Sequence, residues 1–275
     1  MTNHLVSTQW LQQHLNDKNL VLLEATLPKA TDKNQPISNL LIPNSVKFDL
    51  VNTFKDSSSP YPNTIPSIKQ FEKEVQRLGI SNDHTIVVYD KHGVYSSPRA
   101  WWMFKYFGHQ QVFVLDGGLP QWIKENYSTE TSYKLMTKLG NFKANVNPAL
   151  ISNTNDVLHN IETNKKIVLD ARSVKRFNAE VEEPREGMRS GHIPGSKNLH
   201  YATLTKQNKL LDVAELKQKF NEIVVGNKPI IYSCGSGITA CILSLAGSQI
   251  GIKNFSIYDG SWSEWGSRKD LPVER

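Results

Sequence analysis

The stretch Ile230-Ile-Tyr-Ser-Cys-Gly-Ser-Gly-Ile-Thr-Ala-Cys241 reads as a buried strand, a tight loop and the first turn of a helix. The first half of the chain repeats this order, because Ile86-Val-Val-Tyr-Asp90 ends an apolar run and a helical stretch follows at 98–107. After each helix comes another apolar strand that leads into Asp-Gly, at Asp116 and at Asp259. A pattern that recurs in the same order indicates an internal repeat.

Earlier segments repeat as well. Leu20-Val-Leu-Leu-Glu-Ala25 corresponds to Ile167-Val-Leu-Asp-Ala171, and both have the nearly continuous apolar character of strands in a parallel sheet. Helix start signals, Ser67-x-x-Gln70 and Asp212-x-x-Glu215, precede the second pair of core strands. Strands that alternate with helices predict an α/β fold, with a parallel sheet flanked by helices in each half.

We therefore predict two homologous domains. The first covers residues 1–128 and the second 148–275, and the polar stretch 129–147 is the expected linker. In open parallel sheets, binding and catalytic groups gather at the carboxyl ends of the strands. Two loops meet this condition, one after Tyr89 and one after Ser233.

The loop after Ser233 carries a candidate nucleophile, Cys234. Two glycines allow the backbone to curl so that its N–H groups surround the thiol, and the following helix adds its N-terminal donors. A thiol in such a cradle should be ionised at neutral pH. The same donors can hold a persulfide anion, so the predicted site is Cys234 with Gly235, Ser236, Gly237, Ile238 and Thr239. Spacing alone leaves the alternative of a buried, inert cysteine at a strand end.

The equivalent place in the first half holds Asp90, which has no sulfur. We therefore predict that the first domain is catalytically inactive. The second cysteine of the chain, Cys241, lies two helical turns after Cys234, too far for an undistorted disulfide, and core packing is expected for it. Core packing is also expected for Trp262 and Trp265.

Several motifs resemble those of the tandem-domain rhodanese family. They are Cys-Gly-Ser-Gly-Ile-Thr-Ala at 234–240, Ser97-Pro-Arg-Ala-Trp-Trp-Met-Phe104, Asp170-Ala-Arg172, Glu183-Pro-Arg185 and Gly191-His-Ile-Pro-Gly195. The loop resembles the signature of the 3-mercaptopyruvate sulfurtransferase branch. The resemblance implies an active site near the interface between an inactive and a catalytic domain. It also implies double displacement, in which a donor sulfurates the cysteine and a thiol, cyanide or a thioredoxin-like protein removes the sulfur.

The neutral residues Gly235 and Ser236 favour a monocarboxylate donor, 3-mercaptopyruvate, over the dianion thiosulfate, which is the alternative donor. A carboxylate needs an arginine placed away from the sulfur. Arg185 is the first candidate and Arg189 the second, against the alternative that each makes a surface or interdomain ion pair. Two positions depart from the family pattern: Asn63 stands where a histidine is common, and Pro194 where an arginine is common.

Composition excludes several function classes. Lys and Arg are scattered over the chain despite a net charge of +6, so nucleic-acid binding is not expected. No apolar run reaches the roughly 20 residues that a bilayer requires, and the first residues do not resemble an export signal, so a cytoplasmic protein without membrane contact is expected. No Cys and His spacing indicates a metal site, and no cofactor is expected. One alternative function is a cysteine phosphatase, but Ala240 stands where such an enzyme would need arginine. A second alternative is a non-catalytic module that binds a protein partner.

Overall fold

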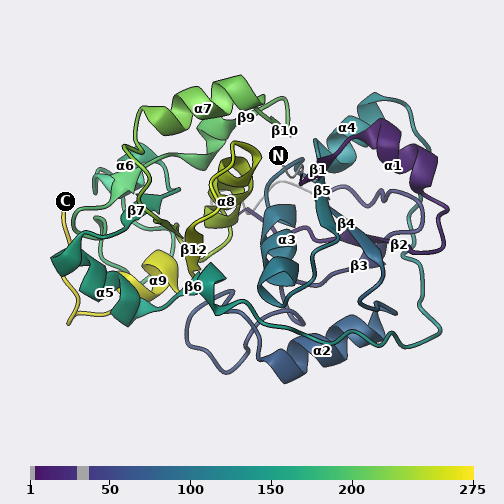
Figure 1. Cartoon of the computed structure of the whole chain (residues 1–275), viewed down its shortest axis with the longest axis horizontal. Helices are drawn as coiled ribbons and strands as arrows, with labels where there is room; N and C mark the ends of the chain where they lie inside the picture. Colours follow the sequence, from purple (N-terminus) through teal and green to yellow (C-terminus); the bar gives the residue numbers. More distant parts are fainter. Residues whose placement is uncertain (1–3, 30–36) are drawn as a thin grey trace.

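The computed structural model describes residues 4–29 and 37–275. Its described part contains two five-stranded parallel sheets, ordered β1-β5-β4-β2-β3 and β6-β12-β11-β7-β8 (Figure 1). The strand order is the same in both sheets once each strand is matched to its repeat. Two α/β domains, each with a parallel sheet flanked by helices, were predicted from the sequence and are confirmed.

The first sheet and its helices comprise the elements β1 (Leu5–Val6), α1 (Thr8–His14), β2 (Leu20–Glu24), β3 (Val46–Lys47), α2 (Ile68–Arg77), β4 (Thr85–Tyr89), α3 (Ser97–Tyr106), β5 (Val112–Leu115) and α4 (Gly118–Lys124). Ser67 caps α2 as predicted, because its hydroxyl accepts a hydrogen bond from the backbone N–H of Gln70. Residues 131–147 contain no helix or strand.

The second half contains η1 (Pro148–Leu150), β6 (Ile151–Ser152), α5 (Thr154–Thr163), β7 (Ile167–Asp170), α6 (Val174–Phe177), β8 (Lys197–Asn198), η2 (Tyr201–Leu204), α7 (Val213–Asn221), β11 (Ile230–Ser233), α8 (Ala240–Gln249), β12 (Phe255–Tyr258) and α9 (Ser261–Trp265). A short antiparallel hairpin of β9 (Thr205–Lys206) and β10 (Lys209–Leu210) precedes α7. Asp212 and Glu215 form the predicted capping box of α7.

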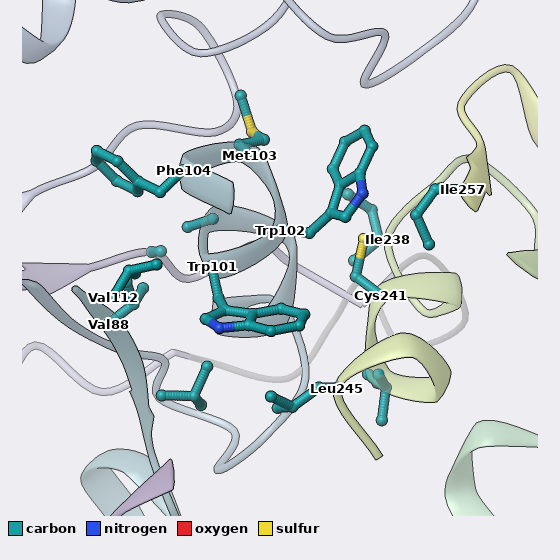
Figure 2. Close-up of a cluster of buried hydrophobic side chains, with 14 of the residues drawn as sticks. Val88, Trp101, Trp102, Met103, Phe104, Val112, Ile238, Cys241, Leu245 and Ile257 are labelled. Carbon is teal, nitrogen blue, oxygen red and sulfur yellow. The ribbon is translucent and has the colours of Figure 1, made fainter. Parts of the chain in front are cut away.

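One hydrophobic cluster spans both domains, and each domain also has a smaller cluster of its own. Helices α3 and α8 lie side by side between the sheets (Figure 1), and α8 is buried on almost every side because nearly all of its residues are apolar or small. Trp101 and Trp102 of α3 point toward the second domain, where Cys241 and Leu245 lie (Figure 2). Cys241 is fully buried, so its predicted place in the core is confirmed.

The described residues include no helix with the length and apolar character that spanning a bilayer would require.

Candidate active site

Cys234 directly follows β11 and is 1% exposed. Gly237 has a φ of +75°, a left-handed conformation that glycine adopts without strain, and it turns the loop toward α8. Residues 235–238 are buried, yet their backbone N–H groups have no acceptor within residues 4–29 and 37–275. Because buried N–H groups rarely remain unpaired, four in a row beside a thiol form a site suited to an anion.

The matching loop of the first domain already holds an anion of its own. The Asp90 carboxylate accepts hydrogen bonds from the backbone N–H groups of Tyr95, Ser96 and Ser97 at 2.8 to 3.0 Å. Its other oxygen accepts from the N–H of His92 at 2.9 Å. The backbone amides of the loop after β4 therefore surround the carboxylate of Asp90, which stands in place of the cysteine.

Ser261 at the start of α9 contacts the cysteine, which sequence reasoning missed. Its hydroxyl accepts from the Cys234 N–H at 3.2 Å and lies 4.0 Å from Sγ. Ser261 has a φ of 50°, the value that its first-half counterpart Gly118 also shows. A left-handed conformation costs a non-glycine residue roughly 1–2 kcal/mol. The Asp259-Gly260 turn before Ser261 was the only sequence signal of this arrangement.

Asp116 lies in a turn and Asp259 in a bend, each between a strand and the helix that follows it. Each carboxylate also reaches across to the other domain. Asp116 accepts from the N–H of Leu210 at 3.1 Å, and Asp259 accepts from the N–H of Ile65 at 2.8 Å. The two contacts are equivalent under the internal repeat, so the repeat extends to how the domains bind each other.

Arg99 of α3 is 1% exposed and joins three segments around the loop. Its guanidinium donates to Asp259 Oδ1 at 2.7 Å, to the carbonyl oxygen of Asn63 at 2.6 Å and to that of Gly237 at 3.2 Å. Burial by itself lowers the pKa of an arginine, but the Asp259 carboxylate and the Cys241 sulfur together outweigh it, so the pKa of Arg99 is raised. The partners of Arg99 therefore lie at the domain interface, and Asp90 is not among them.

Ser236 receives two donors through its hydroxyl oxygen. Asn63 Nδ2 donates at 2.9 Å and Arg185 Nη2 at 3.2 Å. Asn63 comes from the first domain and has a φ of 61°, which asparagine tolerates better than most residues. Since both acceptor positions of Ser236 are engaged, its own proton is left to point toward a ligand.

A cavity of about 620 Å³ lies between the domains beside this loop. Its lining residues with hydrogen-bonding or ionic groups include Cys234, Ser236, Thr239, Asn63, Arg172, Arg176, Arg185 and Lys29. Among the described residues of this lining there is no aspartate or glutamate. The site is therefore positively charged, as an anionic substrate requires.

The arginines of the cavity differ in their pairing. Arg172 and Arg176 both donate to the buried carboxylate of Glu183. Arg185 has no acidic partner among the described residues. A methyl group placed on Gly235 would lie 3.1 Å from Arg176 Nη2 and 3.8 Å from Arg185 Nη1, so both guanidinium groups lie over the cysteine loop. Arg176 was not predicted, because no motif marks it.

Arg189 does not line the cavity, and its position does not support the substrate role predicted for it. Its guanidinium donates to the backbone carbonyl oxygens of Trp265, Gly266, Arg268 and Leu271, and so secures the C-terminal segment. His192 is structural as well, since its Nδ1 bonds the carbonyl of Phe177 at 2.9 Å and its ring stacks on Phe177. Among the described residues, no cluster of three or more His, Cys, Asp or Glu side chains is placed to hold a metal ion.

The Rhodanese-like domain family matches the chain twice, over residues 7–125 and 153–268. The chain belongs to the rhodanese family. The two matches correspond to the two parallel sheets, so the tandem arrangement that the sequence motifs implied is confirmed.

Known rhodanese-family proteins are similar to this chain over nearly its full length. The 3-mercaptopyruvate sulfurtransferase of Escherichia coli K12 is 39% identical over 99% of this chain and 98% of its own. The human protein of the same name is 37% identical, over 95% and 91%. The crystal structure of SseA from Escherichia coli superposes with a TM-score of 0.86 at 34% identity, covering 95% of this chain and 99% of that one.

Proposed function

We propose that this rhodanese-family protein is a sulfurtransferase that accepts sulfur from 3-mercaptopyruvate and carries it as a persulfide on Cys234. The observation that carries the proposal is a buried thiol beside four backbone amides that have no acceptor among the described residues. The thiol lies at the edge of a cavity whose charged side chains, within the described part of the chain, are all cationic. Amides so placed stabilise a thiolate and, after sulfur transfer, the persulfide anion. The relatives named 3-mercaptopyruvate sulfurtransferase support the same activity.

In the first half-reaction the Cys234 thiolate attacks the sulfur of 3-mercaptopyruvate. The new S–S bond forms while the C–S bond of the donor breaks, and the electron pair of that bond leaves on the pyruvate enolate. The proton of the donor thiol, released as the persulfide ionises, converts the enolate to pyruvate. The oxygen of the Ser236 hydroxyl accepts from Asn63 and Arg185, which leaves its proton free to donate, and we assign to it the hydrogen bond that stabilises the developing enolate.

The donor carboxylate binds Arg185, with Arg176 beside it. Arg185 is the better carboxylate partner because no acid among the described residues competes for it, whereas Arg176 is already paired with Glu183. The neutral Gly235 and Ser236 favour a monoanion at the sulfur. Thiosulfate is the alternative donor, and a relative from Gallus gallus that is 36% identical over 95% of this chain carries the name thiosulfate sulfurtransferase.

The proposal assigns different roles to the two domains. The first, over 1–128, is inactive because Asp90 replaces the nucleophile, and it supplies Asn63 and Arg99 to the site of the second, over 148–275. The segment 129–147 connects them. Acceptors are thiols, cyanide or a thioredoxin-like protein, and the expected location is the cytoplasm, since thiols stay reduced there.

Mass spectrometry of the intact protein after exposure to 3-mercaptopyruvate tests the proposal. The protein should gain the mass of one sulfur atom, dithiothreitol should remove it, and Cys234→Ser should abolish the gain. Cys241→Ala serves as the matched control, because that cysteine is core and the variant should still be loaded. Failure of the wild-type protein to take up sulfur from either donor would instead support a non-catalytic binding module.

Comparison of kcat/KM for 3-mercaptopyruvate and thiosulfate then decides between the donors, because this ratio reports differential transition-state stabilisation.

A further inference from the structure

The cavity beside Cys234 is larger than the donor requires. A cavity of about 150 Å³ holds a molecule the size of benzene, and 3-mercaptopyruvate is of similar size. The cavity measures about 620 Å³. Most of it therefore remains open when the carboxylate of a donor lies on Arg185.

The lining residues fall into two groups of different character. One group is the cysteine loop with Arg176 and Arg185, described above. The other comes mainly from the first domain and is apolar and aromatic, with one cation among its described residues. These residues include Leu27, Pro28, Lys29, Val51 and Tyr95, together with Tyr201 of the second domain. The rings of Tyr95 and Tyr201 meet edge to face at 5.9 Å, and Lys29 Nζ lies 5.3 Å from the centre of the Tyr95 ring.

Among the described residues of the lining, two cations have no carboxylate partner. Arg172 and Arg176 are offset by Asp170 and Glu183. Within residues 4–29 and 37–275, no ion pair reaches Lys29 or Arg185. A monocarboxylate donor offsets only one of these two charges. The second cation, on the aromatic side of the cavity, needs an anion of its own.

We infer that Lys29, Tyr95 and Tyr201 form an acceptor subsite that selects small thiols bearing a carboxylate. The inference rests on the proposed function. The acceptor carboxylate pairs with Lys29 and its carbon chain packs on the two tyrosine rings, with the thiol directed toward Cys234.

The transfer is balanced without any further reactant. The acceptor thiolate attacks the outer sulfur of the Cys234 persulfide, a new S–S bond forms on the acceptor, and the S–S bond to Cys234 breaks. Its electron pair returns to Cys234 as the thiolate. The acceptor leaves as a persulfide, and no oxidant or reductant is consumed.

Three thiols of similar length and different charge test this subsite: 3-mercaptopropionate, 2-mercaptoethanol and cysteamine. The protein is first loaded with sulfur, and the second-order rate of sulfur loss to each thiol is measured for wild type, Lys29→Met, Lys29→Arg and Lys69→Met. Lys69 is an exposed lysine outside the cavity, so Lys69→Met changes the net charge equally and controls for it. Each variant is compared with wild type for the same thiol, so differences in intrinsic thiol reactivity cancel.

Lys29→Met should slow sulfur loss to 3-mercaptopropionate about fivefold, because the variant loses a partly solvated ion pair with the acceptor carboxylate. The rate with 2-mercaptoethanol should stay within about twofold of wild type, and the rate with cysteamine should rise. Lys29→Arg should restore the wild-type rates, and Lys69→Met should not change them.

Equal losses with all three thiols, or an unchanged rate with 3-mercaptopropionate, would overturn the acceptor subsite. So would a lower rate of loading from thiosulfate or 3-mercaptopyruvate in Lys29→Met, since Lys29 would then bind the donor. Each of these results leaves the proposed function intact. That function fails separately, at the loading step, if wild-type protein takes up no sulfur.

Discussion

Replacing Arg99 with methionine removes the cation that joins the two domains around the cysteine loop. Asp259 would then keep a carboxylate whose side chain is 8% exposed, with no counter-charge, and the carbonyl oxygens of Asn63 and Gly237 would lose a donor. Removing one partner of a buried ion pair costs roughly 3–5 kcal/mol, because the other charge stays buried. At roughly 2–4 °C per kcal/mol for a chain of this size, Tm should fall by roughly 6–20 °C.

A double-mutant cycle with Asp259→Asn isolates the pair. The coupling free energy between the two positions should be at least about 2 kcal/mol, measured by denaturant unfolding, because both side chains are desolvated. The raised pKa of Arg99 keeps the guanidinium charged, so the coupling should not change between pH 6 and pH 9. Arg268→Met, which removes an exposed ion pair with Asp270, is the matched control and should leave Tm unchanged.

A second readout separates positioning of the loop from stability alone. The alkylation rate of Cys234 by iodoacetamide, measured on folded protein well below Tm, should fall in Arg99→Met, since Gly237 loses its tie to α3. Additive free energies in the cycle would refute the assignment of Arg99 as an interdomain anchor. An alkylation rate equal to wild type would refute its role in positioning the loop.

Three further predictions concern the site and its surroundings. Arg185→Met should lower kcat/KM for 3-mercaptopyruvate roughly 10- to 100-fold and leave Tm unchanged, whereas Arg189→Met should lower Tm and leave kcat per folded molecule near wild type. The reverse pattern would contradict the substrate role of Arg185 and the structural role of Arg189. Asn63→Asp replaces the hydrogen-bond donor to Ser236 by a carboxylate and should lower the rate of sulfur loading onto Cys234 at least about tenfold, measured by stopped-flow. An unchanged rate would show that loading does not use this hydrogen bond. Burial lowers the pKa of His4 to about 4 and also lowers that of His200, so both bind protons less readily in the folded protein than in the unfolded chain, where the ordinary pKa is 6.5. The unfolded chain therefore binds more protons, and Tm should fall as the pH drops from 6.5 toward 4, less steeply in His4→Gln.

Local patterns were enough to predict the architecture. The repeat of apolar strands, the caps at Ser67 and Asp212 and the apolar helix after Cys234 depend on residues close together in the chain, and backbone propensity and burial act at that range. The same holds for the cysteine itself. A thiol between two glycines at the carboxyl end of a core strand can be identified without knowledge of what lies across from it.

The partners of long polar side chains depend on the tertiary structure alone. Arg185 and Arg189 are equivalent candidates in the sequence, yet one lies beside Ser236 and the other binds carbonyl groups of the C-terminal segment. Arg176 carries no motif, and Asp259 looks like a turn residue until Arg99 is brought to it from the other domain. An arginine or aspartate has no periodicity that reveals its partner, because its ion pairs and hydrogen bonds are fixed only when segments far apart in the chain pack together.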